Sequence, residues 1–275
     1  MDIFAEITNR IISEIEKDGV LAWRKPWMAT GVAVSHTTGK AYSLLNQMLL
    51  GRAGEWLTFK QVQDEGGYVR RGEKSRMVVF WKWLDKEDEE TGEIKQVPYL
   101  RYYNVFHLSQ CEGITAKHMQ QNTNPANPDE TAENMIAEYV RREGITLEHE
   151  EGDRAFYQPA TDRIVVPMMK QFTESAEYYS TCFHECVHST GHMKRLARLD
   201  TTANFGSESY SKEELIAELG SAALVNHCGM ETASSFHNSA AYIQGWLTTL
   251  KNDKRFIVSA AGKAEKAVNY ILTGN

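Results

Sequence analysis

Residues 184–188 read His-Glu-Cys-Val-His, and this HExxH arrangement constrains the chain more than any other feature. Histidines four positions apart on a helix lie on one face, so both imidazoles can bind a single ion. The glutamate between them is then placed to act as a general base. The pattern therefore requires a helix at this position and indicates metal-assisted hydrolysis.

The flanking residues favour the helix that the motif needs. Thr173 is predicted to be the N-cap, acidic residues follow in the first turn, and Gly191 is predicted to end the helix. We therefore expect about four helical turns carrying His184, Glu185 and His188. The alternative is a polar helical face that holds two histidines and no metal.

A catalytic zinc commonly takes three protein ligands, so a third is expected downstream. The position six residues after His188 is Lys194, which excludes the three-histidine arrangement of metzincins. His192 follows Gly191, where the helix is predicted to end, and is expected to lie at the rim of the site outside the ligand set. A direct role for His192 in metal binding stays open.

Residues 210–224 predict a second helix, with Ser211 as its cap, and supply a better third ligand. Glu214 and Glu218 share one face of this helix, and small residues around them would allow a close approach to the first helix. The pair is similar to the acidic pair of gluzincins, which makes Glu214 the expected ligand and Glu218 the partner of a ligand histidine. The alternative is an acidic face exposed to solvent.

The remaining catalytic roles follow from this arrangement. Glu185 is expected to accept a proton from water and pass it to the leaving amine, and Tyr210 or His192 is a candidate to stabilise the oxyanion. A packed tyrosine and a surface histidine are the alternatives. The segments 154–158 and 163–167 predict a hairpin beside the metal helix, where an extended peptide could align. Zinc is the expected ion, and another divalent transition metal would suit the same ligands.

Composition limits the classes of protein to consider. No run of eighteen apolar residues occurs, so no membrane-spanning helix is expected. The N-terminal residues lack the features of an export signal, and a cytoplasmic location is expected. The four cysteines, which have no CxxC spacing, are expected to be reduced thiols: Cys111, Cys182, Cys186 and Cys228.

The two halves of the chain differ in charge. Residues 1–120 contain 16 Lys and Arg and 16 Asp and Glu, so the net charge of −7 belongs to residues 121–275. The stretch between the halves is polar, contains proline and has no hydrophobic periodicity. We predict an α+β fold of two domains, residues 1–118 and 131–275, joined by a linker at 119–130.

The first domain combines helix and strand patterns. Apolar residues at helical spacing between 3 and 15 predict a helix that packs within its own domain. Aromatic and β-branched residues predict strands at 57–60, 77–83 and 99–106, and the acidic stretch 85–93 is predicted to be the loop between the last two. Basic and aromatic residues alternate elsewhere in this half, a composition suited to single-stranded nucleic acid, although aromatic strands more often form a core.

Several segments together resemble antirestriction proteins of the ArdC type. In the first half these are Trp-Arg-Lys-Pro-Trp at 23–27, Thr-Gly-Lys-Ala-Tyr at 38–42 with Asn46, and the segments 56–61, 66–67 and 71–74. In the second half they are 183–192, 195–196, 205–208 and 210–218. The chain differs from a typical member in its acidic stretch at 85–93 and in Ser35-His36, where proline and asparagine are common.

The resemblance implies a domain that binds single-stranded DNA, joined to a zincin-like metallopeptidase domain and encoded on conjugative or phage-like elements. The implied role is protection of incoming DNA from restriction. The residues expected to contact DNA are Trp23, Arg24, Lys25, Trp27, Tyr42, Asn46, Phe59, Lys60, Arg71 and Lys74.

Three interpretations stay open. The favoured one combines single-stranded DNA binding with an active zinc peptidase, whose protein substrate the sequence does not name. The second keeps DNA binding but makes the zincin fold a silent scaffold, and Glu185 argues against it because scaffolds often lose the base. The third is a protease effector whose first domain recognises protein, and the pairing of tryptophan with basic residues argues against it.

Overall fold

A computed structural model of the chain describes residues 2–18, 32–87, 94–118, 128–199, 208–230 and 240–274. Its helices and mixed sheets confirm the α+β class. The first half consists of α1 (Ile3–Asp18), β1 (Ala33–Ser35), α2 (Leu44–Leu50), β2 (Gly54–Thr58), α3 (Phe59–Asp64), β3 (Tyr68–Val69), β4 (Arg76–Glu87), β5 (Ile94–His107) and β6 (Cys111–Glu112). The second half consists of α4 (Pro128–Glu143), β7 (Thr146–Glu150), β8 (Phe156–Gln158), β9 (Arg163–Pro167), α5 (Ser175–Thr190), α6 (Glu208–His227), α7 (Ala240–Asn252) and α8 (Phe256–Thr273).

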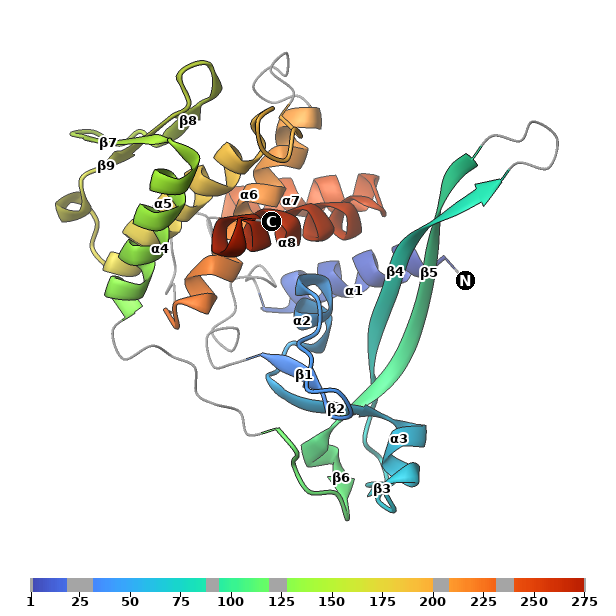
Figure 1. Cartoon of the computed structure of the whole chain (residues 1–275). Helices are drawn as coiled ribbons and strands as arrows, with labels where there is room; N and C mark the ends of the chain where they lie inside the picture. Colours follow the sequence, from blue (N-terminus) through green and yellow to red (C-terminus); the bar gives the residue numbers. More distant parts are fainter. Residues whose placement is uncertain are drawn as a thin grey trace.

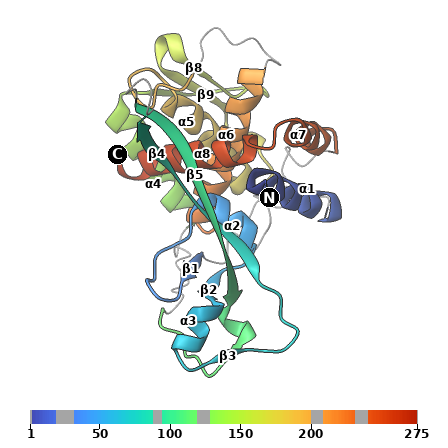
Figure 2. The same cartoon turned by 90° about the vertical axis from the view of Figure 1, so that its right-hand side faces the viewer.

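The first half is built on a four-stranded sheet of order β1-β2-β5-β4. Strands β4 and β5 pair antiparallel along the whole of β4, from Arg76 opposite Val105 to Glu87 opposite Ile94. Figures 1 and 2 show this hairpin as a long twisted arm that rises from the region of β1 and β2. The strands predicted at 77–83 and 99–106 are confirmed, and residues 88–93 of the predicted loop lie outside the described part.

The strand predicted at 57–60 is wrong at its end, because Phe59 and Lys60 begin helix α3. Thr58 stops the strand: its hydroxyl accepts a hydrogen bond from the Gln61 backbone N–H, and the Gln61 side chain accepts one from the Thr58 backbone N–H. This capping box satisfies two backbone donors at the helix start. The aromatic and β-branched composition of the segment hid the capping signal.

The second half places a small sheet beside a group of helices. The sheet has the order β7-β9-β8, and the predicted hairpin is confirmed by the antiparallel pairing of β8 with β9. Helix α5 packs against β8 and β9 on one side and against α6 and α8 on another. Figure 1 shows α5 between the sheet and the helices α6 and α8. The edge strand nearest this helix is therefore β8.

Helix α1 joins the two halves. Ile7, Ile11 and Ile15 are 0–2% exposed and belong to the same core as the helices of the second half. The helix contacts α2, but also α7 and α8, and the Thr8 hydroxyl donates to the Lys254 carbonyl at 2.7 Å. The prediction that this helix packs within its own domain is therefore wrong in part. An amphipathic pattern shows that a face is buried, but it does not identify what covers the face.

Two further sequence predictions concern the ends of elements and membranes. Residues 119–127 of the predicted linker lie outside the described part, and residues 128–130 form the first turn of α4. Within the described residues, no helix is long and apolar enough to cross a bilayer.

Candidate metal centre

Helix α5 carries the HExxH motif, as predicted, and is buried over most of its length. It ends at Thr190 with Gly191 as its C-cap. Its N-cap is Glu174, whose backbone is extended, so the prediction that Thr173 caps the helix is wrong by one residue. Neither the apolar pattern nor the acidic first turn distinguishes between these adjacent positions.

Helix α6 lies close against α5 and supplies the acidic residues. It begins at Glu208, so Ser211 lies inside the helix and does not cap it. Small residues make the close approach: a Cβ on Gly220 would lie 2.7 Å from Val187 Cγ2, and the Ser221 hydroxyl donates to the Ser180 carbonyl at 2.7 Å. The two helices are therefore near enough for carboxylates of α6 to reach the histidines of α5.

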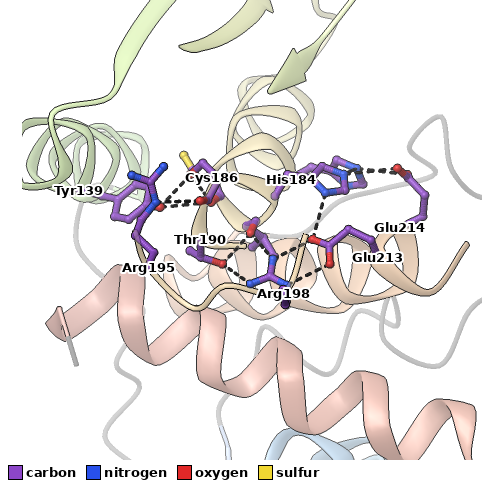
Figure 3. A network of polar contacts seen from close by, with 11 residues as sticks. Tyr139, His184, Cys186, Thr190, Arg195, Arg198, Glu213 and Glu214 are labelled. Carbon is purple, nitrogen blue, oxygen red and sulfur yellow. Dashed lines mark hydrogen bonds and ion pairs between the residues drawn. The ribbon is translucent and has the colours of Figure 1, made fainter. Parts of the chain in front are cut away.

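His184, His188 and Glu214 converge on one point. The two Nε2 atoms are 3.1 Å apart, Glu214 Oε2 lies 3.5 Å from His184 Nε2, and Glu214 Oε1 lies 3.4 Å from His188 Nε2. Figure 3 shows the Glu214 carboxylate facing His184. Ligand atoms about 2.0–2.1 Å from a tetrahedral zinc are separated by roughly 3.3 Å, so these residues fit a divalent metal. They also form a group in the described residues that could hold an ion.

Acidic residues of α6 contact the other nitrogen of each imidazole. Glu218 Oε1 lies 3.7 Å from His184 Nδ1, and Glu213 Oε1 lies 3.3 Å from His188 Nδ1. Such partners orient a ligand histidine and increase its basicity. The sequence predicted this role for Glu218 and missed Glu213, which had appeared to be only the neighbour of the ligand Glu214.

Arg198 holds Glu213 in place. Its Nε and Nη2 donate to the two oxygens of Glu213 at 3.0 and 2.8 Å, and its Nη1 donates to the Thr190 hydroxyl at 2.6 Å. The side chains of Arg198 and Glu213 are 9% and 14% exposed, so little solvent screens the pair. Figure 3 shows Arg198, Thr190 and Glu213 together, next to His184. Arg198 lies outside the motif and both predicted helices, so no local pattern pointed to it.

These contacts change the pKa values of His188 and Glu214. Burial disfavours charge on His188, but its contacts with Glu213 and Glu214 outweigh burial and raise its pKa to about 10. Burial would raise the pKa of Glu214, whereas its contacts with His184 and His188 hold it well below the usual 4.5. The site therefore concentrates negative charge where a cation would bind.

The group lines a cleft of about 910 Å³. Glu185 is 6% exposed and faces this cleft, as do residues 155–157, which include the start of β8. Lys212 and Lys263 lie on the wall formed by α6 and α8. A buried carboxylate next to a candidate metal position can act as a general base, and a cleft of this volume can hold several residues of a peptide.

The other predicted residues of this half occupy different positions. His192 lies in the turn after α5, and its Nδ1 accepts a hydrogen bond from the Lys194 backbone at 3.1 Å. Tyr210 lies in α6, and its side chain is outside the described part. The four cysteines are free thiols, as predicted, and burial raises the pKa of Cys182 to about 12.

The residues predicted to contact DNA divide into three groups. Trp23, Arg24, Lys25 and Trp27 lie outside the described residues. Phe59, Lys60, Arg71 and Lys74 are exposed. Tyr42 and Asn46 make contacts within the protein. Tyr42 packs against a small core of buried residues.

Asn46 is 6% exposed and covers the free edge of β4. Its amide donates to the Val79 carbonyl and accepts from the Val79 N–H, both at 2.8 Å. The backbone N–H and carbonyl of Val79 on the unpaired edge of β4 thereby find partners. Burial and this pair of bonds account for Asn46 without a DNA contact.

Comparison with known proteins places these features in a family. A model described as the N-terminal domain of anti-restriction factor ArdC matches residues 1–106, and a model described as a zincin-like metallopeptidase matches residues 131–263. An uncharacterized protein of Sinorhizobium fredii, y4eC, is 32% identical over 98% of this chain and 91% of its own length. DNA primase TraC of Escherichia coli is 35% identical over 97% of this chain, which spans 27% of the primase.

Solved structures agree with this assignment. The metal-free crystal structure of the antirestriction protein ArdC from plasmid R388 has a TM-score of 0.76 and 37% identity, covering 98% of this chain and 97% of that chain. A Mn(II)-bound structure of the same protein has a TM-score of 0.76. The chain therefore belongs to the ArdC family of antirestriction proteins, with an ArdC-type N-terminal domain followed by a zincin-like metallopeptidase domain.

Proposed function

We infer that this protein binds single-stranded DNA through its N-terminal domain, carries a metal-dependent peptidase site in its C-terminal domain, and protects DNA of a mobile element from restriction in the cytoplasm. The observation that carries the peptidase part is the convergence of His184, His188 and Glu214 beside the buried Glu185. Family membership supports the antirestriction role.

His184, His188 and Glu214 would hold the metal, and Glu213 and Glu218 would orient the two imidazoles. When bound, the ion supplies Lewis acidity toward a carbonyl oxygen and toward water. Glu185 would accept a proton from water and return it to the leaving amine. The edge strand β8 lies along the same cleft, where an extended peptide could add backbone hydrogen bonds.

Zinc is the metal that we expect. Two imidazole nitrogens and one carboxylate are a common set for catalytic zinc. The same set would accept other divalent transition metals, and the ArdC protein of plasmid R388 has a Mn(II)-bound structure. Metal identity is therefore a property to measure on protein purified without added metal.

Single-stranded DNA is the ligand that we assign to the N-terminal domain. Exposed cations at Lys60, Arg71 and Lys74 suit phosphates, and an exposed aromatic ring at Phe59 suits a base. A duplex would offer phosphates but few accessible base faces. We therefore expect tighter binding to single strands, with an affinity that falls as salt rises.

The experiment that tests this function is plasmid transfer into a restricting host. Cells would express the wild type, Glu185→Ala, or Lys60→Ala/Lys74→Ala. If protection depends on coating the strand, Glu185→Ala should protect as the wild type does and the double variant should fail. If Glu185→Ala binds DNA normally but fails to protect it, hydrolysis is part of the protective role. Protection by neither the wild type nor any variant would contradict the proposal.

A second function differs only in the chemistry of the C-terminal domain. In that alternative the zincin fold is a catalytically silent scaffold. In a third alternative the protein is a protease effector, and its N-terminal domain recognises protein instead of DNA. Cleavage of a peptide library by the wild type but not by Glu185→Ala would exclude the scaffold. Binding of the wild type to DNA at physiological salt would exclude the third alternative.

A further inference from the structure

The β4–β5 hairpin carries an exposed group that the sequence predictions did not include. Phe80 and Tyr103 are 51% and 46% exposed, and Arg101 is also exposed. Phe80 pairs with Arg101 and Val78 pairs with Tyr103. Paired residues of antiparallel strands point to the same face, as do residues two apart on one strand. Phe80, Arg101 and Tyr103 therefore lie together on one face of the hairpin, and we name them the outer patch.

The outer patch begins where packing of this face ends. Val78 and Val105, on the same face, belong to a small core with Trp56. The opposite face carries Met77 and Val79, which belong to the main core. The hairpin is therefore anchored on both faces near its base. The outer patch starts at Tyr103, opposite Val78 of the small core, and extends beyond that core to Phe80 and Arg101. Grouped aromatic side chains in such a position indicate an interaction surface.

The chemistry of the outer patch favours one class of partner. Two aromatic rings offer flat faces on which unpaired bases can stack, and a guanidinium on the same face of the hairpin suits a phosphate or a base. Bases in a duplex are already stacked on one another, so the rings would gain little from double-stranded DNA. The positive charge of Arg101 also complements a phosphate backbone better than it complements an apolar protein surface.

We propose that the outer patch is the surface on which this protein stacks the bases of single-stranded DNA. This inference rests on the proposed function of the N-terminal domain and identifies where the bases bind. The exposed cations Lys60, Arg71 and Lys74 belong to the same domain and would contribute attraction for the phosphate backbone.

The neighbouring Tyr102 provides a matched control. It is 43% exposed, close to the 46% of Tyr103, but it lies on the opposite face because adjacent strand residues point to opposite sides. Replacing either tyrosine by alanine removes the same ring from the same strand. Only the face of the hairpin differs between the two variants.

The test measures binding of the full-length chain to a fluorescent oligothymidine by anisotropy. Phe80→Ala and Tyr103→Ala should each weaken binding about tenfold, since stacking dominates the contribution of such a ring. Tyr102→Ala should stay within about twofold of the wild type, and Tyr103→Phe should retain most of the affinity because it keeps the ring. Arg101→Ala should reduce the salt dependence by roughly 0.7 of a slope unit.

The possible results separate the outer patch from the proposed function. Two results would overturn the proposal for the outer patch while DNA binding stands. In the first, the wild type binds but Tyr102→Ala loses as much affinity as Tyr103→Ala. In the second, Phe80→Ala and Tyr103→Ala bind as the wild type does. If the wild type does not bind the oligonucleotide, the proposed DNA binding fails and the outer patch fails with it. Thermal unfolding of each variant checks that the fold is intact.

Discussion

At the scale of single residues, the metal centre depends on carboxylates that do not contact the metal position. Glu213 joins His188 to Arg198, and Glu218 lies against His184. Each histidine therefore has a carboxylate on the nitrogen that faces away from the site. This arrangement fixes the ring orientation before a metal arrives.

Glu213→Gln should weaken metal binding by about 10–100-fold, the usual effect of removing the charge behind a ligand histidine. Glu138→Gln is the control, because it makes the same chemical change at an exposed position on a different helix, α4. Competition with a chromogenic zinc chelator measures the affinity. Equal affinities of the two variants would show that Glu213 does not orient His188.

Glu55 supports a second buried polar group, in the N-terminal domain. It is 3% exposed, accepts hydrogen bonds from the backbone N–H groups of Lys117 and His118, and contacts the imidazole of His36. Burial would raise its pKa, but these contacts together lower it below 4.5. Glu55 therefore ties residues 117–118 to the sheet.

Glu55→Gln should lower the free energy of unfolding by about 1–3 kcal/mol at pH 7, because the new amide places a donor against donors. A carboxyl whose pKa is lowered on folding stabilises the fold above the unfolded value of 4.5, and this contribution is lost as pH falls through the lower folded value. Urea unfolding at pH 7 and pH 4 should therefore show a smaller difference between variant and wild type at pH 4. A larger difference at pH 4 would contradict this account.

Residue identities predicted part of the site. The spacing of His184 and His188 and the face shared by Glu214 and Glu218 were sufficient for the group that the structure brings together. Glu213 was missed because its role depends on Arg198, which lies in the segment that follows α5. The family resemblance placed Asn46 among the residues expected to contact DNA. Nothing in the sequence shows that its side chain pairs with the edge of a strand.

At the scale of elements, the distance between α5 and α6 decides whether a site exists. Glu214 is on α6 and both histidines are on α5, so the ligand set depends on how closely the helices pack. Gly220 is a point of close approach, since a Cβ there would lie 2.7 Å from Val187 Cγ2.

Gly220→Ala should destabilise the protein by about 1–3 kcal/mol through overpacking, in spite of the roughly 1 kcal/mol that alanine gains over glycine in a helix. Gly245→Ala in α7 is the matched control, because nothing lies within 4 Å of a Cβ there, and it should be neutral or stabilising. Thermal unfolding and zinc affinity are both measured. Unchanged stability and metal affinity for Gly220→Ala would show that the helices are less tightly packed.

The elements themselves could be predicted where periodicity was long. The helix at α5, the hairpin of β8 and β9, and the long strands β4 and β5 follow from alternation and turn residues. Helix α3 was missed, because its first residues were predicted as the end of a strand. The starts of α5 and α6 were misplaced, because several adjacent residues could begin each helix and tertiary packing selects among them.

At the scale of the whole molecule, the two domains of the ArdC architecture share a core. Helix α1 and strand β4 of the first half contribute to the same buried cluster as α5, α6 and α8. The difference in charge between the two halves of the chain predicted two domains, but it did not predict that these domains pack against each other. Separate functions for the two domains therefore have to be tested with point variants in the full chain.

Glu185→Ala should bind single-stranded DNA with the affinity of the wild type, because Glu185 faces the cleft of the C-terminal domain and the outer patch lies on the β4–β5 hairpin. Anisotropy with the same oligothymidine measures this. In the reverse direction, Tyr103→Ala should keep its zinc affinity. Loss of DNA binding in Glu185→Ala would show that the two activities are coupled through the shared core.

The central claim is that His184, His188 and Glu214 form one metal site with Glu185 as its base, and calorimetric titration of metal-stripped protein with zinc tests it most directly. The wild type and Glu185→Ala should each bind one ion per chain with similar affinity, because Glu185 is not a ligand. Glu214→Ala should bind at least about 100-fold more weakly, a larger loss than an orienting residue gives. Wild-type affinity in Glu214→Ala, or an equal loss in Glu185→Ala, would contradict the assignment.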